Sequence, residues 1–161
     1  MTRSSLWLPV LAAGSAALVI AFLGGSMTDT GPWYQGLTKP AWQPPGWAFA
    51  PAWTIIFALA ALSAAIAWRD APTDADREWV IAMFAANGVL NVLWSGLFFT
   101  AQRPDWALFE VAILWISILV PIVVIGRYSR LASLLLLPYL AWVAFAAFLN
   151  YRVVQLNGPF G

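Results

Sequence analysis

The sequence contains no cysteine and no histidine among its 161 residues. Without cysteine, disulfides and thiolate chemistry are excluded. Without histidine, the chain lacks the most common metal ligand, the most common general base and the usual axial ligand of haem. We therefore expect no metal site and no required cofactor.

Charged residues are also scarce, since they make up 9% of the chain against about a quarter in a soluble domain. The net charge is +1 and forms no basic stripe, which argues against nucleic acid as a partner. Hydrophobic residues make up 62%, and long apolar stretches separate the clustered charges. This pattern predicts an integral membrane protein rather than a soluble core.

Five stretches are long enough to cross about 30 Å of hydrocarbon, which needs roughly 20 mostly apolar residues. They cover approximately residues 6–25, 45–68, 79–101, 106–125 and 131–154. The sequence thus predicts an all-α fold, in which one domain over residues 1–161 forms a bundle of five transmembrane helices. A signal peptide is the alternative for the first stretch. Its apolar run exceeds the roughly 7–15 residues of such peptides, so we expect a retained helix.

The distribution of basic residues predicts an orientation. With five spans, the chain ends face opposite sides of the membrane. The side of the N-terminus has five basic residues: Arg3, Arg69, Arg77, Arg127 and Arg130. The other side has three: Lys39, Arg103 and Arg152. The positive-inside rule favours a cytoplasmic N-terminus and an outside loop at 27–44, in a bacterial cell membrane. An outer membrane stays an alternative.

Polar side chains inside apolar spans are costly and therefore informative. Asn87 and Asn91 lie one helical turn apart in the third span, and Trp94 continues their face. Two interpretations stay open for the asparagines: hydrogen bonds between helices, or the wall of a ligand cavity. We interpret Glu110, near the start of the fourth span, as a helix-end group near the interface rather than a catalytic acid.

The fifth span presents Trp142, Ala146 and Asn150 on one face, at intervals of four residues. A large ring followed by a small residue one turn later forms a shelf beside a recess, and simple packing is the alternative. Pro138 is expected to kink the helix just before this face.

The first span carries a stripe of small residues at every fourth position: Ala13, Ala17, Ala21 and Gly25. Small residues let membrane helices approach closely. Packing within the bundle is the favoured interpretation, and a second protomer is the alternative.

Residues 33–53 gather large rings and helix breakers: Trp33, Trp42, Trp47, Trp53, Pro40, Pro44, Pro45 and Pro51. An interfacial aromatic belt needs fewer rings than this. Pro44 and Pro45 suit the first turn of the second helix, and Pro51 is expected inside that helix, where it frees a carbonyl. We expect the 27–44 segment to be an ordered loop that caps the bundle.

Three motifs carry a resemblance to a known family: WYQGLTKPAWQPPGW, NVLWSGLFF and PYLAWVAFAAFLNY. In this order they resemble the tryptophan-rich sensory protein and translocator protein family (TspO/MBR), also called peripheral-type benzodiazepine receptors. The resemblance covers nearly the whole chain. It implies a five-helix bundle, usually a homodimer, with a pocket under the loop between the first two helices.

The resemblance also implies the ligands and the site. Family ligands are tetrapyrroles such as protoporphyrin and haem, together with synthetic isoquinoline carboxamides and benzodiazepines, and sterols in animal members. Carried over by position, the ligand-binding residues are Trp33, Trp42, Trp53, Asn87, Asn91, Trp94, Trp142 and Ala146. Rigid aromatic walls suit a flat apolar macrocycle that a few polar groups orient. Sterol-like ligands stay an alternative, and tetrapyrroles are the preferred class, because Arg152 follows Tyr151 directly and the strict cholesterol motif is not met.

Three functions compete. The first is a membrane receptor or sensor that binds tetrapyrroles and influences their traffic or breakdown. The second is a light-dependent, protoporphyrin-degrading enzyme, for which Trp53 and Trp142 match the positions that the family holds responsible. A tetrapyrrole or sterol transporter ranks last, because paired intramembrane charges and an inverted repeat are not evident. For haem, binding is expected to rest on ring stacking and burial, with Lys39 as a candidate contact for the propionates.

Overall fold

The computed structural model describes residues 6–161, and its elements are all helical in that range. In chain order they are α1 (Trp7–Met27), α2 (Pro32–Gly36), the 3₁₀ turn η1 (Gly46–Ala48), α3 (Phe49–Asp70), α4 (Asp74–Ser95), the π-helical segment η2 (Gly96–Thr100), α5 (Pro104–Ile125), α6 (Arg130–Leu135) and α7 (Leu137–Asn157). Five units are long and apolar enough to cross a membrane: Trp7–Met27, Gly46–Asp70, Asp74–Thr100, Pro104–Ile125 and Arg130–Asn157. The predicted all-α bundle of five spans is confirmed.

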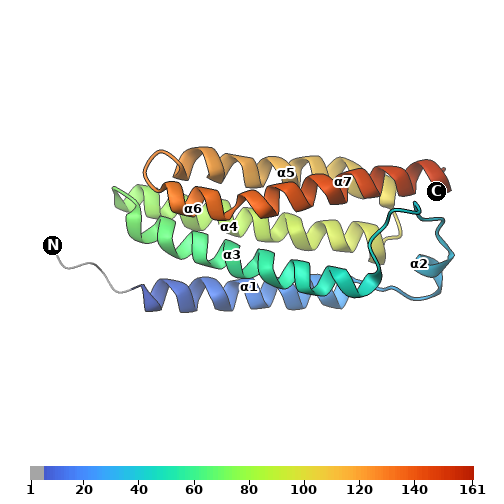
Figure 1. Ribbon diagram of the computed structural model, residues 1–161, viewed down its shortest axis with the longest axis horizontal. Helices are drawn as coiled ribbons and strands as arrows, with labels where there is room; N and C mark the ends of the chain where they lie inside the picture. Colours follow the sequence, from blue (N-terminus) through green and yellow to red (C-terminus); the bar gives the residue numbers. More distant parts are fainter. Residues whose placement is uncertain (1–5) are drawn as a thin grey trace.

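The long helices lie side by side along one axis (Figure 1). α1 packs against α3 and α4, while α5 packs against α4 and α7, and α6 fills the space beside α3 and α5. The start of α1 and the end of α7 lie at opposite ends of the bundle. The loop that carries α2 sits at the same end as the end of α7. We call the end of the bundle that carries this loop the loop end, and we call the opposite end the short-connection end.

The prolines before the second span act differently from the prediction. Pro45 has extended backbone (φ −62°, ψ 147°) and precedes η1, so Pro44 and Pro45 lie before the helix and not in its first turn. Pro51 is the third residue of α3. It therefore lies inside the second spanning helix, as predicted, but in the first turn of α3, where proline is tolerated because the first amides have no partner in the helix.

The fifth span consists of two helices. α6 ends at Leu135 and α7 begins at Leu137, with Pro138 as its second residue. Proline lacks an amide hydrogen, so it fits the start of a helix and cannot continue one from the preceding turn. The kink expected at Pro138 is thus a full interruption of the helix at Leu136.

The α1 stripe faces the bundle only in part. Ala13, Ala17 and Ala21 are half-buried, and α1 packs against α3 and α4. Gly25 is exposed, and its neighbour Gly24 is the buried residue of the helix. The small residue that lets α1 and α4 approach closely is Gly88 of α4, because a Cβ at this position would collide with the Ile20 side chain of α1.

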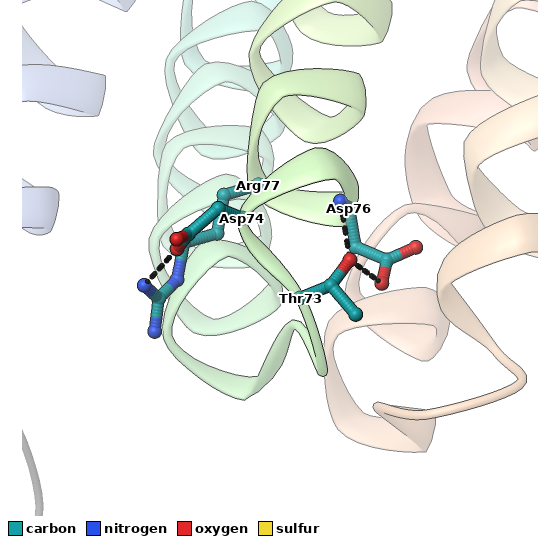
Figure 2. Close-up of polar contacts among 4 residues, drawn as sticks. All are labelled: Thr73, Asp74, Asp76 and Arg77. Atoms are coloured by element: carbon teal, nitrogen blue, oxygen red, sulfur yellow. Dashed lines mark hydrogen bonds and ion pairs between the residues drawn. The ribbon is translucent and has the colours of Figure 1, made fainter.

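A capping arrangement starts α4 at the short-connection end (Figure 2). The backbone N–H of Asp76 donates to Thr73 Oγ1 at 3.1 Å, and the Thr73 hydroxyl donates to Asp76 Oδ2 at 2.6 Å. Arg77 Nη1 donates to Asp74 Oδ1 at 2.8 Å. The cap satisfies an amide that has no partner inside the helix, and the two acids suit the positive end of the helix dipole.

Candidate functional site

Two of the predicted tryptophans meet between α3 and α7. The rings of Trp53 and Trp142 are edge-to-face, with centroids 6.3 Å apart and an interplanar angle of 83°. Tyr139 flanks Trp53 at 6.1 Å, and Phe145 flanks Trp142 at 5.6 Å. Edge-to-face rings at this spacing attract each other beyond the gain from burial. The structure therefore brings together the residues that the light-dependent reaction would require.

A second aromatic group lies where the loop meets the end of α4. Trp94 stacks on Phe98 with centroids 5.1 Å apart, and Trp33 of α2 meets the same Phe98 ring at 6.1 Å. Tyr34 packs against Phe99 at 5.5 Å. Trp33 and Trp94 thus share one ring between them, although they lie 61 positions apart in the sequence (94 − 33 = 61).

Trp42 lies at the edge of the first group, where it packs against α7. Its ring stacks on Phe148 at 5.2 Å, and 45% of the residue is exposed. It also meets Phe145 at 5.9 Å, and that ring in turn contacts Trp142. In this structure Trp42 fastens the loop to α7 instead of lining an interior wall.

The loop is also fastened by a pair of hydrogen bonds to the last residue of α7. The backbone N–H of Thr38 donates to Asn157 Oδ1 at 2.7 Å, and Asn157 Nδ2 donates to the Thr38 carbonyl at 2.8 Å. The two residues are 119 positions apart. Sequence reasoning missed Asn157, and no local pattern could have signalled its partner.

Lys39 is engaged within the loop. Its Nζ donates to the carbonyls of Tyr34 at 2.6 Å and Leu37 at 3.2 Å, and it stands 4.4 Å from the centroid of the Tyr34 ring. The expected contact with ligand propionates would therefore compete with contacts that Lys39 already makes.

The two asparagines of α4 form hydrogen bonds between helices. Asn87 Nδ2 donates to Ser117 Oγ of α5 at 2.9 Å, and Asn91 Nδ2 donates to the hydroxyl of Tyr139 at 3.0 Å. That hydroxyl donates to Asn87 Oδ1 at 3.1 Å. Of the two open interpretations, the structure shows the hydrogen-bonded one. A cavity of about 10 Å³ beside Asn87, Ser117 and Tyr139 leaves room for a single water.

Ala146 and Asn150 lie on the inner side of α7. Ala146 is half-buried, and Asn150 is fully buried. With its amide oriented to donate to the Pro104 carbonyl at 3.0 Å, Asn150 also accepts from the Leu108 amide at 3.2 Å. The face predicted for Trp142, Ala146 and Asn150 therefore turns toward the bundle.

The interpretation of Glu110 as an interfacial helix-end group is wrong. Its exposed fraction is 5%, and neither carboxyl oxygen has a hydrogen-bond partner among residues 6–161. It is the seventh residue of α5, and the preceding turns bury Pro104 and Ala107 as well. The sequence places it near a helix start, but only the packing of α5 against α4 and α7 shows that it faces inward.

A groove of about 360 Å³ lies between α3 and α7 beside the tryptophan pair. It is lined by Ala52, Ile55, Ile56, Pro138, Ala141, Trp142 and Phe145. Its volume falls in the range of small-molecule sites, which is about 300–1,000 Å³. The eight predicted residues do not line one common cavity: Trp142 lines this groove, and Asn87 lines the water-sized cavity.

Nothing in the described part of the chain suggests a metal centre. Residues 6–161 hold no group of three or more histidine, cysteine, aspartate and glutamate side chains that could bind a metal ion. Buried polar residues of the described chain include Asn87, Asn91, Glu110 and Asn150, together with several serines. The indole nitrogen of Trp142 is buried without a hydrogen-bond partner in residues 6–161.

Five apolar spans and two groups of partly buried aromatic rings define a multi-pass membrane protein. The sequence profile of the TspO/MBR family matches residues 12–156. The chain belongs to this family, as its motifs indicated.

Curated relatives agree with this assignment. The chain is 41% identical over 152 residues to the tryptophan-rich protein TspO of Archaeoglobus fulgidus, which covers 93% of this chain and 97% of that protein. It is 33% identical over 158 residues to the translocator protein of Sus scrofa, with 94% and 91% covered. It is 32% identical over 133 residues to the tryptophan-rich sensory protein of Cereibacter sphaeroides, with 83% and 82% covered.

Proposed function

We propose that this protein is a membrane receptor or sensor that binds tetrapyrroles, such as protoporphyrin and haem, at the loop end of the bundle. The observation that carries the proposal is the contact between Trp53 and Trp142 beside an apolar groove of about 360 Å³. Flat aromatic ligands gain most from rigid aromatic walls, and such walls are concentrated at this end. The names of the relatives, sensory protein and translocator protein, agree with a role in sensing or moving a small molecule.

Titration of tryptophan fluorescence tests this proposal. Protoporphyrin, haem and a sterol are added to the purified protein in detergent, and quenching of the indole emission reports binding. Trp53→Phe and Trp142→Phe remove the two indole fluorophores nearest to the proposed site. Most of the ligand-induced quenching should therefore disappear in these variants. The matched control is Trp79→Phe, because Trp79 is 65% exposed and lies in the second turn of α4, the helix that begins at the short-connection end (Figure 1). Equal loss of quenching in the control would contradict a site at the loop end.

A light-dependent breakdown of protoporphyrin is the second candidate, and the edge-to-face contact of Trp53 with Trp142 favours it. Adjacent indoles beside an excited macrocycle can quench it or relay an oxidising equivalent. Illumination of the bound complex followed by product analysis separates the two candidates. In the double variant Trp53→Phe/Trp142→Phe, stacking persists, so much of the binding should remain while any breakdown stops. If the wild-type protein leaves the ring intact under light, the enzyme hypothesis fails and the receptor hypothesis stands.

A further inference from the structure

Glu110 is a buried carboxyl group that the tryptophan pair does not use. The residue is 5% exposed within a membrane-spanning helix, and both of its oxygens lack hydrogen-bond partners among residues 6–161. Buried polar groups in native proteins are nearly always paired, and ionisable groups inside membrane bundles mark functional sites. The two carboxyl oxygens of Glu110 are therefore free to accept hydrogen bonds from a group outside residues 6–161.

The register of α4 and α5 gives the level of this carboxyl along the bundle. The two helices run in opposite directions and are joined by the hydrogen bond from Asn87 to Ser117. Moving seven residues, or about two turns, toward the loop end leads from Asn87 to Trp94 and from Ser117 to Glu110. Glu110 thus lies at the level of Trp94. One turn nearer the loop, Ala107 packs in the cluster that contains Phe98 and Trp33.

The chemistry of a tetrapyrrole indicates which of its polar groups would contact Glu110. The propionates are anionic and belong at the membrane interface, and a second carboxyl would not attract them. The polar groups that such a ligand carries into the bundle are its pyrrole N–H groups, and a carboxyl oxygen is a strong acceptor for them. Haem has no such N–H groups, because iron replaces both protons of the metal-free ring.

We infer that Glu110 is a specificity-determining residue that accepts hydrogen bonds from the pyrrole N–H groups of the ligand. This inference rests on the proposed binding of tetrapyrroles and adds a preference among them. The preference increases with the accessibility of N–H groups. The preference is absent for haem and intermediate for protoporphyrin, because the closed ring of protoporphyrin encloses its N–H groups. It is largest for an open-chain tetrapyrrole, whose N–H groups are not enclosed.

The test compares three ligands on four proteins. Biliverdin, protoporphyrin and haem are titrated against the wild type, Glu110→Leu, Glu110→Gln and the control Glu78→Gln, in which an exposed acid of α4 is changed. Glu110→Leu should weaken biliverdin by about tenfold, protoporphyrin by less, and haem by under about twofold. Glu110→Gln keeps a carbonyl acceptor and should retain most of the affinity for biliverdin. The control should bind all three ligands as the wild type does.

Stability gives a readout that a purely structural role would not produce. Replacing an unpaired buried polar group by an apolar one of similar size is neutral or stabilising. Glu110→Leu should therefore unfold in detergent at the same temperature as the wild type or at a higher one. Infrared difference spectra should show a carboxyl band that shifts when biliverdin binds, is absent in Glu110→Gln and persists in Glu78→Gln.

Each failure has a separate signature. If the wild type binds none of the three ligands, the proposed function itself is refuted. If the wild type binds them and Glu110→Leu weakens haem as much as biliverdin, Glu110 supports the site in general or ligates the metal, and the inference is overturned. The inference is also overturned if the carboxyl band does not shift when biliverdin binds, or if Glu110→Leu is less stable than the wild type.

Discussion

The two ends of the bundle are built from different contacts. At the short-connection end, residues 71–73 join α3 to α4, and hydroxyl and charged groups close the structure. Ser129 Oγ donates to Asp70 Oδ2 at 2.8 Å, and the cap of α4 is formed by residues three positions apart (Figure 2). At the loop end, residues 28–45 cover the helices with aromatic rings and with hydrogen bonds to the far end of the chain.

This difference separates stability from function. The cap of α4 joins near neighbours, so it forms as soon as the helix forms and fixes where the helix starts. The hydrogen bond from Ser129 to Asp70, in contrast, spans 59 positions and joins the end of α3 to the start of α6. Contacts between distant segments form only when the whole bundle has assembled. A ligand bound between the helices can therefore strengthen or weaken these contacts. Ligand chemistry is therefore expected at the loop end, and changes at the two ends should have separate consequences.

The largest effect is expected from filling the inner face of α7. Ala146→Phe adds a ring one turn from Trp142, on the side that faces the bundle. A ligand that uses this recess should bind at least about tenfold more weakly, which corresponds to about 1.4 kcal/mol. Fluorescence titration with protoporphyrin measures the change.

The matched control is Ala144→Phe, which adds the same ring at an exposed position of α7. It should keep the wild-type affinity. If Ala146→Phe binds as tightly as this control, the ligand does not occupy the inner face of α7.

Much of the fold could be predicted from the sequence, because hydrophobic length and charge placement decide membrane spans in lipid. The five spans were placed this way, and the pair of Trp53 with Trp142 followed from the family motifs. The break of the fifth span was foreseen only as a kink at Pro138, since proline predicts a disturbance and not its size.

The inward direction of side chains could not be predicted in the same way. Glu110 lies in the second turn of α5, where a carboxylate can reach the interface or face the bundle. Packing with α4 and α7 decides between these outcomes, and no local pattern records it. The contact made by Trp42 could not be predicted either, because its ring stacks on Phe148, which lies 106 positions away (148 − 42 = 106) in another of the three motifs.

An intermediate effect is expected from loosening the loop. Asn157→Ala removes both hydrogen bonds to Thr38, which are partly exposed and worth about 1 kcal/mol each at most. The loop must then be ordered when a ligand binds, so affinity should fall by about fivefold. Hydrogen exchange at the Thr38 amide should accelerate in the same variant.

Gln155→Ala serves as the control, because the hydrogen-bond partners of Gln155 are Tyr151 and Arg152 on its own helix. It should leave both the exchange rate and the affinity unchanged. If Asn157→Ala speeds exchange but binds the ligand as the wild type does, the loop covers the bundle without contributing to the site.

The smallest effect on binding is expected at the short-connection end. Thr73→Ala removes the oxygen that accepts the Asp76 N–H, and loss of such a cap costs about 1 kcal/mol of unfolding free energy. Thr73→Ser keeps the hydroxyl and should restore the stability, which unfolding in detergent measures. Tetrapyrrole affinity should stay within about twofold of the wild type in both variants, because a twofold change is only about 0.4 kcal/mol. A cap variant that folds fully yet loses affinity for protoporphyrin would show that the two ends are coupled through the helices, and the separation of stability from function would fail.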